Sequence, residues 1–336
     1  MMKHLFHKSF RYCTYSIFLL LTFGLVSGCA NDTPINIDDP LESKGTYDVH
    51  ISSVSIPNPE NLDKSFSGKV YFPSQDGGTS RESGDYTLIL LTPGFSASFT
   101  LYERFAKHFV SHGFVVLGFN FVPSAKSTDG EHDYKARQVG YAIDFIVSEA
   151  SEISDYIDPT NVGLVGHSMG GKVSFYAASI DQRIRAIAAM DPSNAGGPPC
   201  FISPSNCAAY PVAPNPTRET IGILDNIQVA SLIIRSAPDP LFNPAEEFNA
   251  SWFFYGYDGN GLYAVPSPAV YIDMGKVSHA AYIPLISRPV AAFLKRTMAA
   301  WFMTHLRGEP RSEYYDGDII QKDIDKGLIF AMDYRE

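Results

Sequence analysis

NVGLVGHSMGGKVSFYAA, residues 161–178, joins an apolar run to an amphipathic run through a serine that lies between glycines. The apolar start of this segment, residues 161–165, predicts a short buried strand, and residues 171–178 predict a helix. Gly166-His167-Ser168-Met169-Gly170 fits the strained turn between such a strand and helix, because glycines keep Cβ atoms out of a crowded bend. The pentapeptide alone also occurs by chance, but in this setting it indicates a nucleophilic serine at a helix N-terminus.

Apolar runs that fit strands alternate with amphipathic runs that fit helices along most of the chain. Strands are predicted at residues 49–56, 66–72, 86–91, 114–121, 161–165, 184–190, 227–234 and 269–274, and helices at residues 101–111, 135–149, 171–178 and 286–306. We therefore expect an α/β fold with a mostly parallel sheet of about eight strands and helices on both faces. Ligands of such sheets bind at the carboxyl ends of the strands.

The composition of the chain fits a globular protein. It has 336 residues, of which 45% are hydrophobic and 18% charged, with a net charge of −10 and no basic run. Nucleic acid is therefore not an expected partner, because binding to phosphates needs clustered Lys and Arg. We expect one large catalytic domain at residues 46–310 and an acidic C-terminal extension at residues 311–336.

The N-terminal 28 residues are typical of an export signal. Lys3, Lys8 and Arg11 precede the apolar run 17–26, which is too short for a spanning helix. Val26-Ser27-Gly28-Cys29 resembles a bacterial lipobox, in which the cysteine carries lipid after cleavage. We expect residues 1–28 to be removed, residues 29–45 to form a flexible tether, and lipid on Cys29 to attach the protein to a membrane. The outer membrane or cell surface is favoured over the inner membrane; an ordinary secretory signal is the alternative.

Two further cysteines lie in the Pro- and Gly-rich stretch that follows residue 192. Cys200 and Cys207 could close a small disulfide loop in an oxidising compartment. A metal pair is the competing interpretation, but no further Cys or His lies nearby to complete a ligand set. The disulfide is the preferred interpretation.

A serine nucleophile needs an imidazole base and a carboxylate that orients it. Two histidines follow Ser168: His305 falls late in the closing helix, whereas His279 comes directly after the last predicted strand. His279 is therefore the expected base. The acid stays open, because Asp191 and Asp239 both follow strands and both precede a proline.

The oxyanion of a tetrahedral intermediate needs two hydrogen-bond donors. The backbone N–H of Met169, directly after the nucleophile, is one candidate. The backbone N–H of Phe95, in the loop after residues 86–91, is the other. The side chains of Phe95 and Met169 would then form apolar walls beside the ester.

Three segments carry a resemblance to known α/β-hydrolases. They are Leu91-Thr92-Pro93-Gly94-Phe95, Ser111-His112-Gly113-Phe114-Val115-Val116 and Gly166-His167-Ser168-Met169-Gly170-Gly171-Lys172. The chain resembles the chlorophyllase-like branch of that superfamily and is also similar to bacterial polyester hydrolases and cutinases. Ala189-Met190-Asp191-Pro192 is similar to the chlorophyllase acid motif, and platelet-activating-factor acetylhydrolases space their acid in much the same way. The polyester hydrolases instead imply Asp239; we favour Asp191.

The sequence predicts a lipid-anchored carboxylic ester hydrolase that acts on a small or polymeric apolar ester through an acyl-enzyme. Ser168 would be the nucleophile, His279 the base and Asp191 the orienting acid, with aromatic and proline side chains of the excursion after residue 192 shaping the pocket. No phosphate-binding loop or zinc motif is present, so we expect no metal or nucleotide cofactor. Peptidase, thioesterase and acyltransferase activities share the acyl-enzyme. The alternative of another class is a non-catalytic surface lipoprotein that binds a ligand.

Overall fold

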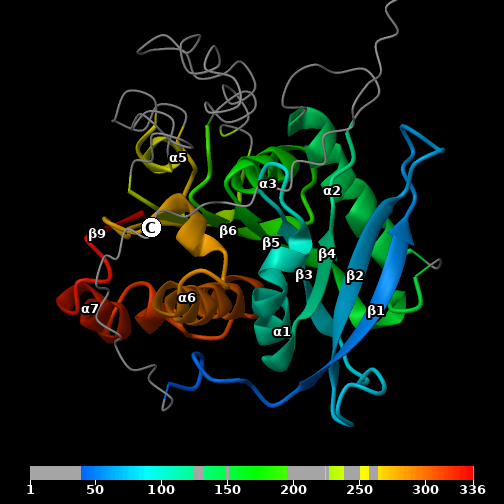
Figure 1. Cartoon of the computed structure of the whole chain (residues 1–336), viewed down its shortest axis with the longest axis horizontal. Coiled ribbons are helices and arrows are strands. Elements are labelled where there is room, and N and C mark those ends of the chain that lie inside the picture. Colours follow the sequence, from blue (N-terminus) through cyan, green and yellow to red (C-terminus); the bar gives the residue numbers. More distant parts are fainter. Residues whose placement is uncertain are drawn as a thin grey trace, which may run out of the picture. The chain divides into compact units, whose positions relative to one another are not determined.

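A single nine-stranded sheet organises the computed structural model, which describes residues 39–123, 132–148, 151–194, 224, 227–237, 250–256 and 264–335 (Figure 1). The strand order is β1-β2-β4-β3-β5-β6-β7-β8-β9. The strands are β1 (Asp48–Ile56), β2 (Phe66–Ser74), β3 (Tyr86–Thr92), β4 (Val115–Phe119), β5 (Ile157–His167), β6 (Ile184–Met190), β7 (Ala230–Arg235), β8 (Ala269–Asp273) and β9 (Ala331–Arg335). Strands β4, β3, β5, β6, β7 and β8 pair in parallel, whereas β1, β2 and β9 join by antiparallel pairing.

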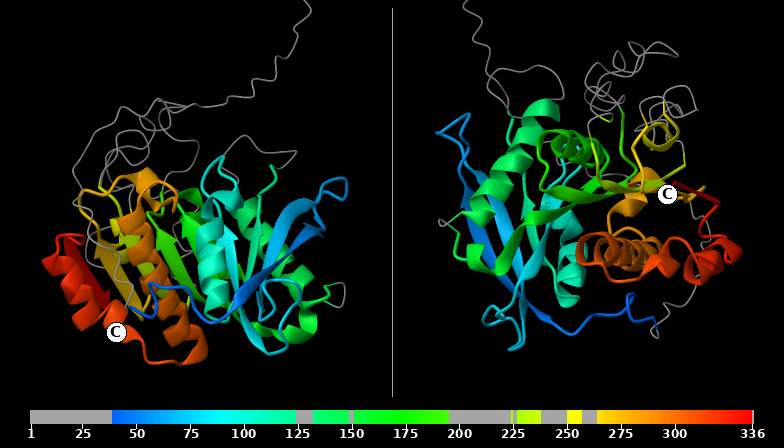
Figure 2. Two further views of the ribbon diagram at one scale, coloured as in Figure 1. Left: turned by 60° about the horizontal axis from the view of Figure 1, so that its bottom comes forward. Right: turned by 180° about the vertical axis from the view of Figure 1, so that it is seen from behind.

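Helices cover both faces of this sheet, and Figure 2 shows the two layers from other directions. The helices and 3₁₀ turns are η1 (Phe99–Tyr102), α1 (Glu103–Ser111), α2 (His132–Val147), η2 (Ser154–Tyr156), α3 (Met169–Ile180), α5 (Ser251–Tyr255), η5 (His279–Tyr282), α6 (Arg288–Arg307), η6 (Ser312–Tyr314) and α7 (Asp318–Asp325). Helices α1 and α6 lie on one face, and α2 and α3 lie on the other (Figures 1 and 2). The predicted α/β fold is confirmed.

Strand β3 shows why both faces need a cover. Its side chains alternate between the two sides, so that Ile89 and Leu91 belong to the core under α1 and α6. Leu88 and Leu90 belong to the opposite core, under α2 and α3. All four side chains are at most 1% exposed. A continuous apolar strand of this kind is stable only in a sheet that is packed on both sides.

The chain order reverses between β3 and β5, and this reversal places the site. From β3 the chain crosses to β4 on one side, while β5 pairs with β3 on its other side. Loops that leave the carboxyl ends of β3 and β5 therefore diverge over opposite faces of the sheet, and a crevice is expected where they separate. The Gly94-Phe95 loop follows β3, and Ser168 follows β5.

The C-terminal segment departs from expectation. The sequence predicts about eight strands, whereas β9 adds a ninth that comes from residues 311–336, which we expected only as an acidic extension. β9 pairs antiparallel with β8, from Asp273 opposite Ala331 to Ala269 opposite Arg335. Its side chains are exposed or half-buried, as is common for a strand at the edge of a sheet.

The end of the expected tether also departs from expectation, because residues 39–45 pack on the domain. Leu41 is 3% exposed and belongs to the core that contains α1 and α6. Tyr314 donates a hydrogen bond of 2.9 Å to the Asp39 carboxylate, and Arg296 forms an ion pair of 3.1 Å with Glu42. These contacts, with a hydrogen bond of 3.0 Å from the Gly45 N–H to the Ser111 hydroxyl, hold a segment whose polar composition suggests a linker.

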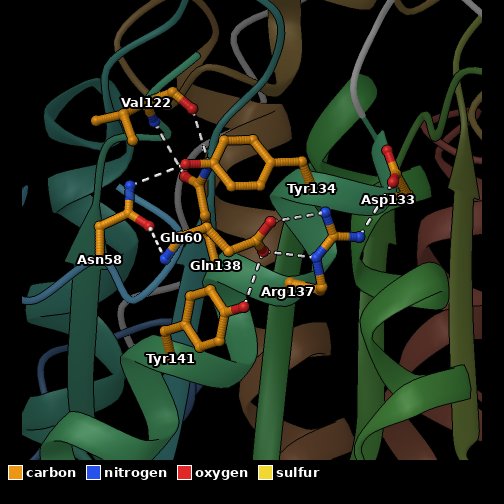
Figure 3. Close-up of polar contacts among 8 residues, drawn as sticks. All are labelled: Asn58, Glu60, Val122, Asp133, Tyr134, Arg137, Gln138 and Tyr141. Carbon is orange, nitrogen blue, oxygen red and sulfur yellow. Dashed lines mark hydrogen bonds and ion pairs between the residues drawn. The ribbon is translucent and has the colours of Figure 1, made fainter. Parts of the chain in front are cut away.

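Hydrogen bonds and ion pairs join α2 to the segment between β1 and β2 and to the segment after β4 (Figure 3). Arg137 of α2 donates to both carboxylate oxygens of Glu60, at 2.6 and 3.2 Å, and Glu60 lies between β1 and β2. Gln138, which is fully buried, exchanges two hydrogen bonds with the backbone of Val122 just after β4. Strands β2 and β4 are antiparallel, so β2 begins beside the carboxyl end of β4. The segments that contain Glu60 and Val122 therefore lie at the same end of the sheet as the loops after β3 and β5.

Within the described residues, no helix combines the length and apolar character needed to cross a bilayer.

Four of the histidines that the structure describes have a pKa below the usual 6.5. Burial is the leading cause at each of them, and it lowers the pKa of His305 from 6.5 to about 4 and that of His167 to about 3. Burial also lowers the pKa of His108 and of His112, with nearby positive charge as an additional cause. These imidazoles are therefore neutral in the folded protein at neutral pH.

We predict that the free energy of unfolding falls as the pH is lowered from about 6.5 towards 4. The unfolded chain protonates its histidines near pH 6.5 while the folded chain does not, so acid favours the unfolded state. Urea denaturation at several pH values in this window measures the slope, and His305→Phe should reduce it. A free energy that stays constant across the window would contradict the prediction.

Candidate active site

Ser168 occupies the corner between β5 and α3. Its backbone angles, φ 56° and ψ −121°, are ones that residues with a side chain rarely adopt. The Ser168 N–H donates to the Met190 carbonyl at 2.9 Å, and the Ser168 carbonyl accepts from the Ser193 N–H at 3.2 Å. Bonds to the last residue of β6 and to the segment after it thus hold the backbone in this conformation.

The two glycines of the pentapeptide are required by space. A Cβ atom at Gly166 would lie 2.4 Å from the Gly170 carbonyl oxygen, and one at Gly170 would lie 2.0 Å from the Thr92 carbonyl oxygen. Both distances are far below van der Waals contact. The close approach is stabilised by Thr92, whose hydroxyl donates to the Gly170 carbonyl at 3.1 Å. The glycines of the pentapeptide therefore permit a tight turn that packs against the end of β3.

His279 and Asp191 meet at the carboxyl ends of β6 and β8. Nδ1 of His279 is hydrogen-bonded to Oδ2 of Asp191. Asp191 is fully buried and His279 is 3% exposed. Ser236, just after β7, adds its backbone N–H at 3.1 Å and its hydroxyl at 2.5 Å to the same carboxylate. Three successive strands thus deliver one residue each to this cluster.

The surroundings of Asp191 keep it ionised. Burial acts to raise the pKa of its carboxyl, but the hydrogen bonds from His279 and Ser236 outweigh burial and hold the pKa below the usual 3.8. An ionised carboxylate can only accept hydrogen bonds, so Nδ1 of His279 must be the donor. In the neutral form of His279 the acceptor is then Nε2, which is the tautomer that a general base needs.

His167, directly before Ser168, lies against His279. The two imidazole centroids are 4.6 Å apart, with an interplanar angle of 34°. Nε2 of His167 is 3.1 Å from the His279 carbonyl oxygen, and Nδ1 is 2.7 Å from the Tyr102 hydroxyl. These contacts bring His279 beside the Ser168 corner.

Sequence reasoning missed three residues of this cluster: Tyr102, His167 and Ser236. The position of His167 inside the pentapeptide was the one available signal. Tyr102 is 65 residues away from its partner in sequence, and Ser236 is an ordinary serine after a strand. Nothing local in the chain marks either of them.

The loop after β3 lies next to Ser168. A Cβ atom at Gly94 would lie 3.5 Å from the Cβ of Ser168, so Phe95 follows at the serine's side. Met169 begins α3, and the first amides of a helix have no acceptor within it. Met169 is 7% exposed and Phe95 is half-buried. The oxyanion role of the Phe95 and Met169 N–H groups stays a prediction.

Backbone strain concentrates in the same place. Among the described residues other than glycine, positive φ occurs at Ser96 (53°), Ser168 (56°) and Asp191 (45°). Each residue lies just beyond a strand: β3, β5 and β6, respectively. Strained conformations of this kind persist where the surrounding structure holds them, and they cluster at functional sites.

Several sequence predictions fall outside the described residues. They are the lipidation at Cys29, the Cys200–Cys207 disulfide, the alternative acid Asp239 and the pocket side chains Phe201, Tyr210 and Pro211. In the part of the chain that is described, no group of three or more metal-ligating side chains occurs. His305 lies in α6 against Trp301 and Tyr315, and it takes no part in the Asp191–His279 cluster.

We predict that Ser168→Gly is more stable than Ser168→Ala. Both variants remove the hydroxyl, but only glycine adopts this φ and ψ without strain, which costs about 1–3 kcal/mol for other residues. Urea denaturation compares the two free energies of unfolding. The same pair of substitutions at Ser179, within α3, is the matched control, because glycine there should be less stable than alanine by about 1 kcal/mol. If the glycine variant were less stable than the alanine variant at Ser168 as well, the corner would be unstrained.

Comparisons with known proteins agree with this architecture. A family model described as PET hydrolase-like matches residues 39–198, a range that contains Ser168 and Asp191. Cutinase est1 of Thermobifida alba is 29% identical over 126 residues, which are 37% of this chain and 39% of the cutinase. A bis(hydroxyethyl) terephthalate hydrolase of Streptomyces coelicolor is 28% identical over 190 residues, 54% of this chain and 57% of that protein. The alignments thus span less than two thirds of these relatives. The chain has the α/β-hydrolase fold, and it is similar to polyester hydrolases, with residues 39–198 matching the PET hydrolase-like family model.

Proposed function

We propose that this protein is a serine-dependent carboxylic ester hydrolase, with Ser168 as nucleophile, His279 as general base and Asp191 as orienting acid. The observation that carries the proposal is the buried hydrogen bond between His279 and Asp191 beside the strained Ser168 corner. A protein that only bound a ligand would have no need for a buried, ionised carboxylate paired with an imidazole at this position. The non-catalytic alternative is therefore disfavoured.

The reaction follows from the roles of these groups. Nε2 of His279 takes the proton of Ser168 as Oγ attacks the ester carbonyl, and Asp191 stabilises the imidazolium that forms. The backbone N–H groups of Phe95 and Met169 are proposed to bind the oxyanion, and loss of one such donor costs about 3 kcal/mol. The imidazolium then protonates the leaving alcohol. Water attacks the acyl-enzyme by the same route and releases the acid.

Asp191 is preferred over Asp239 as the acid. The carboxylate of Asp191 accepts the Nδ1 hydrogen bond of His279, and Ser236 holds both of its oxygens. Asp239 lies in a segment outside the described residues. The bond to His279 supports Asp191 for the role.

The proposed substrate is an apolar ester, with an aromatic polyester as the polymeric example. Phe95 and Met169 flank the two proposed oxyanion donors and offer apolar contact to both sides of an ester. The relatives named as cutinases and as a bis(hydroxyethyl) terephthalate hydrolase support this class of substrate. Retention of activity after metal chelation is part of the proposal, because the chemistry of Ser168, His279 and Asp191 requires no metal.

We predict that Asp191→Asn lowers kcat by at least a thousandfold, whereas the matched variant Asp239→Asn keeps kcat within about twofold of wild type. Asparagine at position 191 would leave Nδ1 of His279 without a charged acceptor and favour the wrong tautomer. Hydrolysis of p-nitrophenyl butyrate and release of soluble product from terephthalate polyester film are measured for each protein.

One outcome would contradict the choice of acid, and another would contradict the proposed activity itself. A large loss in Asp239→Asn with a small loss in Asp191→Asn would reverse the acid assignment. Hydrolysis of neither substrate by wild type would contradict the proposed function, whereas hydrolysis of the nitrophenyl ester alone would restrict it to small esters.

A further inference from the structure

We propose that His167 and Tyr102 are positioning residues that fix the backbone of His279, so that the general base is held at its main chain as well as at its ring. The inference rests on the proposed function and deepens it. We call these two residues the Tyr102–His167 pair. The pair lies in the interior, with Tyr102 3% and His167 4% exposed.

The hydrogen bonds of the pair have only one consistent arrangement. A carbonyl oxygen only accepts, so the proton on the His167 ring must lie on Nε2, which donates to the His279 carbonyl at 3.1 Å. A neutral imidazole has one N–H, so Nδ1 is an acceptor and the Tyr102 hydroxyl donates to it at 2.7 Å. The tyrosine thereby fixes the tautomer that the carbonyl requires.

The loop that carries His279 needs such a support. It leaves β8 through Gly275, which has a φ of 59°, and its next fixed point is the Val277 carbonyl, which accepts from the Ala237 N–H at 2.9 Å. The segment then enters η5, where the Ala281 N–H donates to the Ser278 carbonyl at 3.0 Å. The contact of His167 with the His279 carbonyl restrains the backbone, in addition to the restraint that Asp191 places on the ring, and small misplacements of a reacting group are costly.

The charge state of the pair also suits the reaction. The groups that face the His167 ring are His279, Asp191 and the rings of Tyr102 and Tyr282. Burial, with the nearby His279 as second cause, lowers the pKa of His167 to about 3, and Asp191 only partly opposes this effect. His167 is thus neutral when His279 takes up the proton of Ser168, and it does not repel the imidazolium.

The test compares His167→Phe, His167→Gln and Tyr102→Phe with a control, His305→Phe. His167→Phe removes the donor to the His279 carbonyl and should lower kcat about tenfold with KM within about twofold. Glutamine carries an N–H donor at a similar reach, so His167→Gln should recover most of kcat. Tyr102→Phe removes the hydrogen bond that fixes the tautomer, together with a hydrogen bond to the Gly94 backbone, and should lower kcat about threefold. His305→Phe deletes a half-buried imidazole that lies in α6, outside the site, and should keep the wild-type kcat.

A second readout does not depend on catalysis. The proton on Nδ1 of His279, shared with a buried carboxylate, should give a low-field proton NMR resonance that shifts or broadens in His167→Phe but not in His305→Phe. Thermal unfolding of each variant checks that the fold is retained.

The outcomes separate this inference from the proposed function. Wild-type kcat with an unchanged resonance in His167→Phe would overturn the inference, and so would a His167→Gln variant no better than His167→Phe. Absence of esterase activity in wild type would instead overturn the proposed function, and the NMR comparison would still test the positioning.

Discussion

The buried carboxylate of Asp191 is the constraint on which the site depends. A charge without access to water is tolerated only where hydrogen bonds replace hydration, and removal of one partner of such a group is strongly destabilising. Ser236 and His279 supply these bonds from the ends of two neighbouring segments, after β7 and after β8. The need to satisfy one buried anion therefore fixes where the imidazole must stand.

The sheet determines that these groups can meet at all. Strands β3, β5, β6, β7 and β8 run parallel, so their carboxyl ends lie along one edge and each loop there can contribute a side chain. Positive φ at Ser96, Ser168 and Asp191 shows that the chain is bent sharply at three of these ends. The strain is held by the packed sheet beneath, which is rigid because both of its faces are covered.

Much of this arrangement could be predicted from the sequence, because apolar runs mark the buried strands and the glycine-flanked serine marks the corner. The choice between Asp191 and Asp239 could not be made from local sequence, since both residues end a strand and precede a proline. The Tyr102–His167 pair depends on a contact between residues far apart in the chain, for which a single sequence carries no signal. β9 was missed although residues 328–332 are apolar, because its five residues lie in a largely charged C-terminal segment that indicated an extension.

The central claim is that the hydroxyl of Ser168 is activated by the imidazole of His279. Covalent labelling with a fluorophosphonate, followed by peptide mapping in a mass spectrometer, tests this claim most directly, because the reagent modifies only an activated serine. The expected result is one adduct on the peptide that contains Ser168, formed far more slowly in His279→Ala. No adduct at neutral pH, or an adduct on another residue with Ser168 unmodified, would contradict the claim.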